Sequence, residues 1–252
     1  MAMSPRLLRP RATGFDPKSI AGLIGWWDFS DPTQLRQTTA GATSVSADGD
    51  VVGYAMDKSG NNRPMAANND ARRPAYKVNI LNGRSAVRFD GVDDALGTTT
   101  HTGTAPATQT WFGVFANIST LASSKRFIAR ADNASLFVDD GTTPRRAGYW
   151  SFGTSSFTTP TTAIGNAVYS LTYTSPSECL VRQNGKLIIT VGTPNAAYQT
   201  STSFFLGANS LAGANATNCD CLEALIWHVA LSDAQRSSVE KNLAKKYGLT
   251  LS

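Results

Sequence analysis

Three carboxylates lie within five residues of one another in the segment VRFDGVDDAL (87–96): Asp90, Asp93 and Asp94. Clustered carboxylates can bind calcium, serve as a catalytic acid pair, or accept hydrogen bonds from nearby amides in a turn. Asp-Gly and Asp-Asp are common in turns, so we favour a turn that ends a β-strand. The alternative is a calcium site in which Asp93 and Asp94 bind the ion together with Asp57 of a neighbouring loop.

An aromatic pair could form a sugar-binding platform. Tyr149 and Trp150 lie in the segment RRAGYWSFG (145–153), and alternation along a strand turns one of the two rings outward. An exposed ring beside polar groups is what a lectin uses to hold a sugar. The alternative, which we favour, is that both rings are partly buried in the fold.

A basic arm precedes the first strand-like segment. Residues 1–19 carry a net charge of +3, out of +5 for the whole chain of 252 residues. The charge comes from four residues: Arg6, Arg9, Arg11 and Lys18. Such an arm could dock on an acidic surface or on a neighbouring subunit, and a solvated tail is the alternative. We expect no membrane partner, because no apolar run approaches the roughly 20 residues of a membrane helix. A secretory signal is also not apparent.

Other site chemistries find little support. Three cysteines are an odd number, which argues against a disulfide framework, and the two histidines lack the spacing of zinc ligands. No nucleophile elbow, dinucleotide-binding glycine motif or Walker motif occurs. We therefore expect no cofactor other than calcium, and no sequence-specific binding of nucleic acid.

The elements that must position these residues are mostly β-strands. Short runs of β-branched and aromatic residues recur between turn residues, from LIGWWDFS (23–30) to CLEALIWHVA (221–230). About ten such strands without intervening helices predict an antiparallel sandwich or barrel. Asn184-Gly185 lies between two of these runs and predicts a two-residue hairpin.

A single helix is expected at the end of the chain, over residues 232–247. Ser232 and Gln235 are spaced as a capping box, and Gly248 suits the left-handed position that ends a helix. An apolar stripe with a spacing of four predicts the face that packs on the sandwich: Val239, Leu243 and Tyr247. We expect residues 20–252, including this helix, to form one domain.

Four segments occur in an order that resembles the concanavalin A-like (laminin-G-like) jelly-roll proteins of bacteria and bacteriophages: FDPKSIAGLIGWWDFSD, DKSGNNRP, RPAYKVNILNGRSAVRFDGVDDAL and FFLGANS…CLEALIWHVALSDAQRSSVEKNLAKKYGL. The resemblance covers most of residues 15–250, with a poor match over about 97–165. It implies an all-β fold, namely an antiparallel jelly-roll β-sandwich with one C-terminal α-helix.

The same resemblance carries an expectation about function. Short versions with a basic arm and no signal peptide look like bacteriophage structural proteins that decorate heads or build tails and fibres. We therefore expect a non-enzymatic virion protein, assembled in the host cytoplasm, that docks on other virion proteins and forms a homo-oligomer. The alternative is a lectin-like module that binds host surface glycans.

A glycoside hydrolase is the least favoured interpretation. Hydrolysis needs two carboxyl groups facing one bond, and the chain has only three glutamates: Glu178, Glu223 and Glu240. Hydrolases with the concanavalin A-like fold that this sequence resembles carry E-x-D-x-E on one strand face. The segment CDCLEALIW (219–227) does not match that pattern. The sequence therefore predicts that the protein is not an enzyme.

Overall fold

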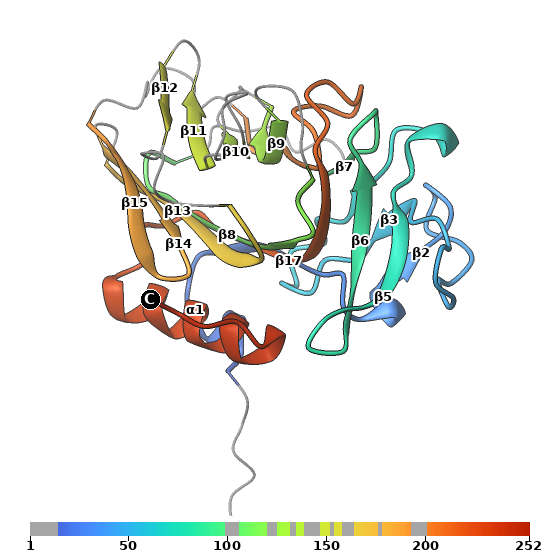
Figure 1. Ribbon diagram of the computed structural model, residues 1–252, viewed down its shortest axis with the longest axis horizontal. Helices are drawn as coiled ribbons and strands as arrows, with labels where there is room; N and C mark the ends of the chain where they lie inside the picture. Colours follow the sequence, from blue (N-terminus) through green and yellow to red (C-terminus); the bar gives the residue numbers. More distant parts are fainter. Residues whose placement is uncertain are drawn as a thin grey trace, which may run out of the picture.

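The computed structural model contains two antiparallel β-sheets packed face to face and a C-terminal helix that covers one of them (Figure 1). It describes a set of segments separated by gaps: residues 15–98, 106–119, 125–131, 135–138, 147–151, 154–157, 164–175, 178–192 and 201–252.

The first sheet has eight strands among the described residues. Seven of them lie in the order β15 (Lys186–Val191), β14 (Glu178–Gln183), β13 (Ala167–Ser175), β8 (Gln109–Ala116), β17 (Asn218–Trp227), β6 (Arg84–Asp90) and β5 (Ala75–Leu81). The eighth, β1 (Leu23–Asp28), pairs with the later part of β17. Asn184 and Gly185 both have positive φ between β14 and β15, so the predicted hairpin is confirmed.

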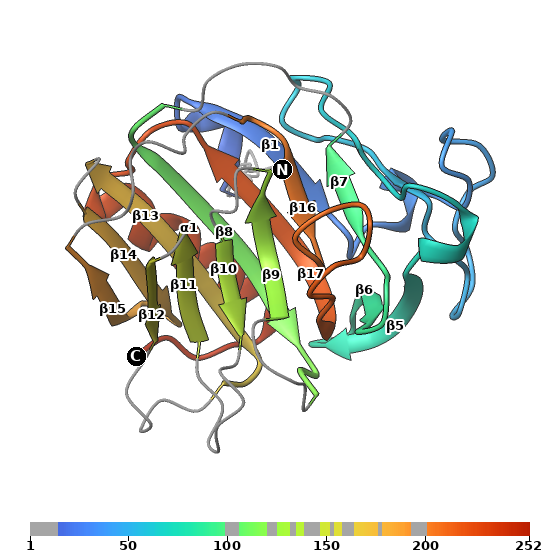
Figure 2. The same ribbon diagram turned by 90° about the horizontal axis from the view of Figure 1, so that it is seen from above.

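The second sheet has nine strands among the described residues, several of them very short. Their order is β12 (Thr154–Phe157), β11 (Ala147–Ser151), β10 (Ser135–Val138), β9 (Lys125–Arg130), β16 (Phe204–Leu206), β7 (Leu96–Thr98), β4 (Met65–Ala66), β3 (Tyr54–Ala55) and β2 (Leu35–Arg36). In the part of the chain that the structure describes, 3₁₀ turns lie before β1, between β1 and β2, and between β4 and β5: η1 (Pro17–Ser19), η2 (Pro32–Gln34) and η3 (Asp70–Arg72). Figure 2 shows β9 to β12 in front of the first sheet, with the helix behind it.

Strand β17 explains why the first sheet is buried on both faces. Ala224 and Ile226 point into the main core between the sheets, whereas Leu225 and Trp227 belong to a second cluster on the outer face. A strand covered on both faces needs a nearly continuous apolar run, and LEALIW supplies one with a single carboxylate, Glu223. That exception marks the site described below.

Helix α1 (Asp233–Tyr247) covers the outer face of the first sheet. Its capping box at Ser232 and Gln235 is present, and Gly248 ends it with φ +66°, as predicted. The predicted stripe is buried in the outer cluster: Val239, Leu243 and Tyr247. No helix among the described residues is long and apolar enough to cross a membrane.

The predicted all-β sandwich with one C-terminal helix is therefore confirmed. The jelly-roll strand order stays a prediction, as do the single domain over 20–252 and the arm over 1–19. At the end of that arm, Phe15 and Ile20 pack against the outer cluster, and Lys18 is exposed. The other three basic residues of the arm lie outside the described residues: Arg6, Arg9 and Arg11.

Candidate functional site

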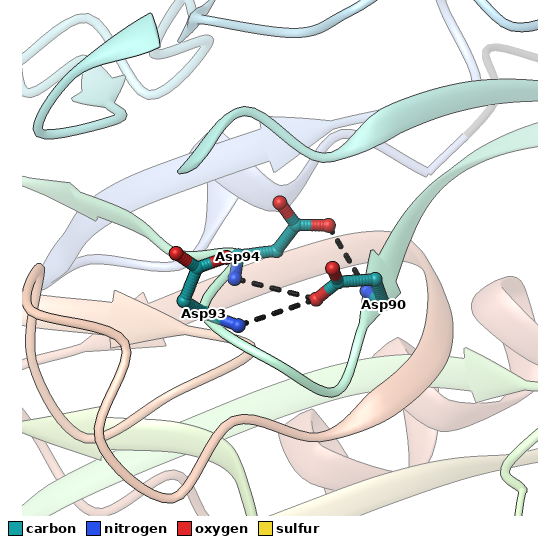
Figure 3. Close-up of side chains that lie close together, drawn as sticks. All are labelled: Asp90, Asp93 and Asp94. Atoms are coloured by element: carbon teal, nitrogen blue, oxygen red, sulfur yellow. Dashed lines mark hydrogen bonds between the residues drawn. The ribbon is translucent and has the colours of Figure 1, made fainter. Parts of the chain in front are cut away.

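The three aspartates of the 87–96 segment do come together at the end of β6 (Figure 3). One carboxylate oxygen from each of Asp90, Asp93 and Asp94 lies within 4.8 Å of the others. Asp90 Oδ1 accepts hydrogen bonds from the amides of Val92 (2.8 Å) and Asp93 (3.3 Å), and Asp94 Oδ2 accepts one from the amide of Asp90 (3.0 Å). These bonds to neighbouring amides are those of the predicted strand-ending turn.

The turn contains one carboxyl group with an unusual proton affinity. Burial, reinforced by the charge of Asp90, raises the pKa of Asp94 to about 6. Asp93 is more exposed and lies 3.6 Å from the Arg72 guanidinium. The calcium interpretation of Asp93 and Asp94 stays a prediction. Its third proposed ligand, Asp57, is not part of this group of carboxylates among the described residues.

Asp57 instead organises its own loop. Its two carboxylate oxygens accept hydrogen bonds from the amides of Trp26 (3.0 Å), Ser59 (2.8 Å) and Arg63 (3.0 Å). These bonds join the loop to β1, and the assignment of Asp57 to a calcium site stays a prediction. The proposed sugar platform, Tyr149 and Trp150, lies in β11, and the side chains of that strand are outside what the structure describes.

A second group of charged side chains lies between α1 and the outer face of the first sheet. Asp28 ends β1 directly opposite Glu223 of β17, and both are almost completely buried. Lys246 of α1 donates hydrogen bonds to Asp28 Oδ2 (2.9 Å) and to Glu223 Oε2 (2.7 Å). The two oxygens are therefore no farther apart than the sum of these distances.

Further donors complete this group. Glu223 also accepts hydrogen bonds from the Trp26 indole (2.6 Å) and the Tyr247 hydroxyl (2.6 Å). Lys58 lies 3.1 Å from Asp28 and 4.9 Å from the centre of the Trp26 ring. The charged groups alternate in sign, which is how buried charges are tolerated in a protein interior.

The two carboxyl groups have opposite proton affinities. Burial and the charge of Asp28 raise the pKa of Glu223, and these effects outweigh the opposing hydrogen bonds of Lys246 and Tyr247. Burial alone would also raise the pKa of Asp28, but Lys246, with Ser30 and Lys58, holds it below its usual value of 3.8. Glu223 is therefore the group that more readily retains a proton, and Asp28 is the more readily ionised.

A cavity of about 500 Å³ opens beside this group. Glu223 and Lys246 form part of its wall, whereas Asp28 is not in the wall. Other residues of the wall that matter below are Trp26, Asn82, Arg84, Asn242 and Lys245. Ligand pockets commonly have volumes of about 300–1,000 Å³. The cavity is therefore large enough for a small ligand.

Pattern reasoning missed this site because its two acids come from strands nearly 200 positions apart in the chain. A search along β17 finds Asp220 and Glu223, which do not fit the E-x-D-x-E pattern, and it cannot find Asp28 on β1. The available signals were one glutamate in an apolar run and one aspartate after the paired tryptophans. The three cysteines are free and buried, as the odd number suggested.

Searches against family models and against curated proteins found no match. Several solved structures are similar in fold. Trypanosoma rangeli sialidase matches at a TM-score of 0.57 and 14% identity, over 92% of this chain and 34% of that chain. A GH54 α-L-arabinofuranosidase matches at a TM-score of 0.67 and 11% identity, over 89% of this chain and 63% of that chain. This chain thus spans about a third of the length of the sialidase and under two thirds of the length of the arabinofuranosidase.

These comparisons correct the functional expectation. The predicted non-enzymatic bacteriophage virion structural protein is wrong, because the similar solved structures are glycoside hydrolases: sialidases and arabinofuranosidases. At such low identity the likeness itself shows the fold alone. The segments that carried the resemblance are core strands and turns. They indicate a fold, and one fold can host many functions.

Proposed function

We propose that this protein acts on carbohydrate as a glycoside hydrolase, in the cavity beneath α1, with Glu223 and Asp28 as its two carboxyl groups. The observation that carries this proposal is the single ammonium of Lys246, which contacts both carboxylates. The nearest oxygens are therefore no farther apart than the sum of these two hydrogen-bond lengths. That limit lies below the roughly 6.5–9.5 Å of inverting glycosidases and favours the closer spacing of the retaining class.

The roles follow from the proton affinities. Glycoside hydrolysis needs one carboxylic acid to protonate the leaving oxygen and a second, ionised carboxylate on the other side of the bond. Glu223, with its raised pKa, is assigned as the acid, and Asp28, with its lowered pKa, as the nucleophile. After the glycosyl group is transferred to Asp28, ionised Glu223 takes a proton from the water that releases it.

Access to Asp28 depends on Lys246. Asp28 is only 6% exposed, and the Lys246 side chain, which is one-quarter exposed, contacts it from the cavity wall. Binding of a sugar therefore requires this side chain to rotate away from Asp28. Trp26 adds an aromatic surface to the wall, of the kind that packs on a sugar ring.

Support for carbohydrate as the substrate comes from the proteins of similar fold. One of them is a sialidase in complex with sialic acid, and another is an arabinofuranosidase complexed with arabinofuranosyl-α-1,2-xylobiose. Because this chain covers only part of each, their activities support a proposal about substrate class and nothing finer.

The test is turnover of a panel of aryl glycosides, including sialosides and arabinofuranosides, by the full chain. We expect hydrolysis that falls by at least about 10³-fold in Glu223→Gln and in Asp28→Asn. Glu178→Gln is the matched control, because this half-buried glutamate lies in β14 and is not in the cavity wall. Circular dichroism checks that each variant folds.

If the buried-site variants fail to fold, the pH dependence of turnover by the unaltered protein replaces them. Binding of a glycan without turnover of any substrate would contradict hydrolysis. Turnover that survives in folded Glu223→Gln and Asp28→Asn would contradict this choice of residues.

A further inference from the structure

The wall of the cavity carries more positive than negative charge. Arg84, Lys245 and Lys246 contribute cations, and Glu223 contributes the carboxylate. The ammonium of Lys246 is already engaged by Asp28 and Glu223. Arg84 and Lys245, by contrast, form no ion pair with any described residue. Two exposed cations therefore face the cavity with their charges unmatched.

The two cations are held there by different elements. Lys245 lies in the last turn of α1, where a basic residue also complements the negative end of the helix dipole. Arg84 begins β6, just after the turn formed by Asn82 and Gly83, and the Asn82 amide donates a hydrogen bond to the Lys246 carbonyl (3.1 Å). The helix dipole accounts for Lys245 but does not explain Arg84. The β5–β6 turn places Arg84 in the cavity wall.

We propose that the ligand of this cavity is an anionic sugar, in which Arg84 and Lys245 bind a carboxylate or sulfate group. This inference rests on the proposed function in taking carbohydrate as the ligand. A guanidinium binds planar oxyanions through paired hydrogen bonds, and an ammonium adds a point charge. The amides of Asn82 and Asn242 and the indole of Trp26 are suited to the neutral part of the sugar.

Calorimetric titration of the full chain with matched ligands tests the proposal. The probes are a galacturonic acid oligomer, a sulfated galactose oligomer and a neutral galactose oligomer of the same length. We expect an acidic oligomer to bind at least about tenfold more tightly than the neutral one, which is the contribution of about one charge-assisted hydrogen bond. The two acidic probes distinguish carboxylate from sulfate.

The variants separate this site from general surface charge. Arg84→Gln combined with Lys245→Gln should abolish the preference for the acidic oligomer, so that the acidic and neutral oligomers bind alike. Lys241→Gln removes a charge from an exposed position of α1 that is not in the cavity wall, and should have no effect. Equal binding of acidic and neutral probes, no binding of any probe, or an equal effect of Lys241→Gln would overturn the proposal.

The outcomes are distinguishable from those of the hydrolysis test. Selective binding of an acidic oligomer without turnover would leave this inference standing and remove the hydrolase. Turnover of glycosides together with equal binding of the acidic and neutral oligomers would leave the hydrolase standing and remove this inference.

Discussion

Asp28 and Glu223 face each other across the β1–β17 pair, and both of their carboxylates contact the same ammonium. That ammonium belongs to Lys246 near the end of α1, so the contact also fastens the helix to the sheet. One group of side chains thereby contributes both to the attachment of the helix and to the proposed chemistry. The stability of the protein and its proposed activity can therefore be tested by substitutions at the same positions.

Lys246→Met should destabilise the protein strongly. The substitution keeps most of the side-chain volume but leaves two buried carboxylates without this counter-charge. Removing one partner of a buried ion pair typically costs about 3–5 kcal/mol, and the partial exposure of Lys246 reduces this to about 2–4 kcal/mol. Denaturant unfolding at neutral pH measures the change.

Lys245→Met is the control for this substitution. Its side chain occupies the neighbouring position and has no described acidic partner, so its effect should be within about 0.5 kcal/mol. If both variants lose the same free energy of unfolding, Lys246 does not neutralise the pair.

Turnover should have an acidic pH optimum. The proposed mechanism needs Asp28 ionised and Glu223 protonated. Activity is lost as the pH falls through the pKa of Asp28, which lies below 3.8, and as it rises through the pKa of Glu223, which lies above 4.5. The pH profile of kcat/KM measures both limbs. A profile that keeps rising above neutral pH would assign the acid to another group.

The sequence predicts local structure in this protein far better than it predicts the site. Ser232, Gln235 and Gly248 define the helix ends through contacts within a few residues, and Asn184-Gly185 defines a turn through its own backbone preference. The Asp28–Glu223 pair depends on β1 being added beside β17, which is a long-range pairing. No local pattern encodes that register.

The aspartate turn lies between these cases. Its hydrogen bonds span at most four residues, so a turn could be predicted from Asp90 and the residues after it. The burial of Asp94 depends on packing of the surrounding fold and could not be predicted. The raised pKa of Asp94 follows from that burial.

Asp94→Asn should stabilise the protein in a pH-dependent manner. The native state holds the proton of Asp94 up to about pH 6, whereas the unfolded chain releases it near 3.8. The free energy of unfolding of the unaltered protein therefore loses a contribution as the pH rises through this window. Asparagine carries no such proton and can still accept the bond from the Asp90 amide.

The increase in the free energy of unfolding of Asp94→Asn over the unaltered protein should be absent below pH 3.8, grow towards pH 6 and then stay constant. Urea unfolding of both proteins across this range measures it. Asp70→Asn, at an exposed position of η3, controls for removal of a surface charge. A gain that does not vary with pH would show that Asp94 is not the titrating group.

Two glycines with similar backbone angles should respond very differently to alanine. Gly207 and Gly49 have φ of +79° and +89°, a region that L-residues adopt at a cost of about 1–2 kcal/mol. A Cβ at Gly207 would overlap the ring of Phe89 in the main core, whereas a Cβ at Gly49 would meet nothing within 4 Å. The pair separates backbone strain from steric overlap.

Gly49→Ala should therefore cost about 1 kcal/mol, and Gly207→Ala about 3 kcal/mol or more, because overpacking adds to the same strain. Phe89 is fully buried between the sheets, so its ring can move only by displacing other core side chains. Thermal and denaturant unfolding of the two variants give the difference directly. Equal losses would mean that β16 and the loop after it can shift away from β6, and that the two sheets are less tightly packed at this point than their buried aromatic residues indicate.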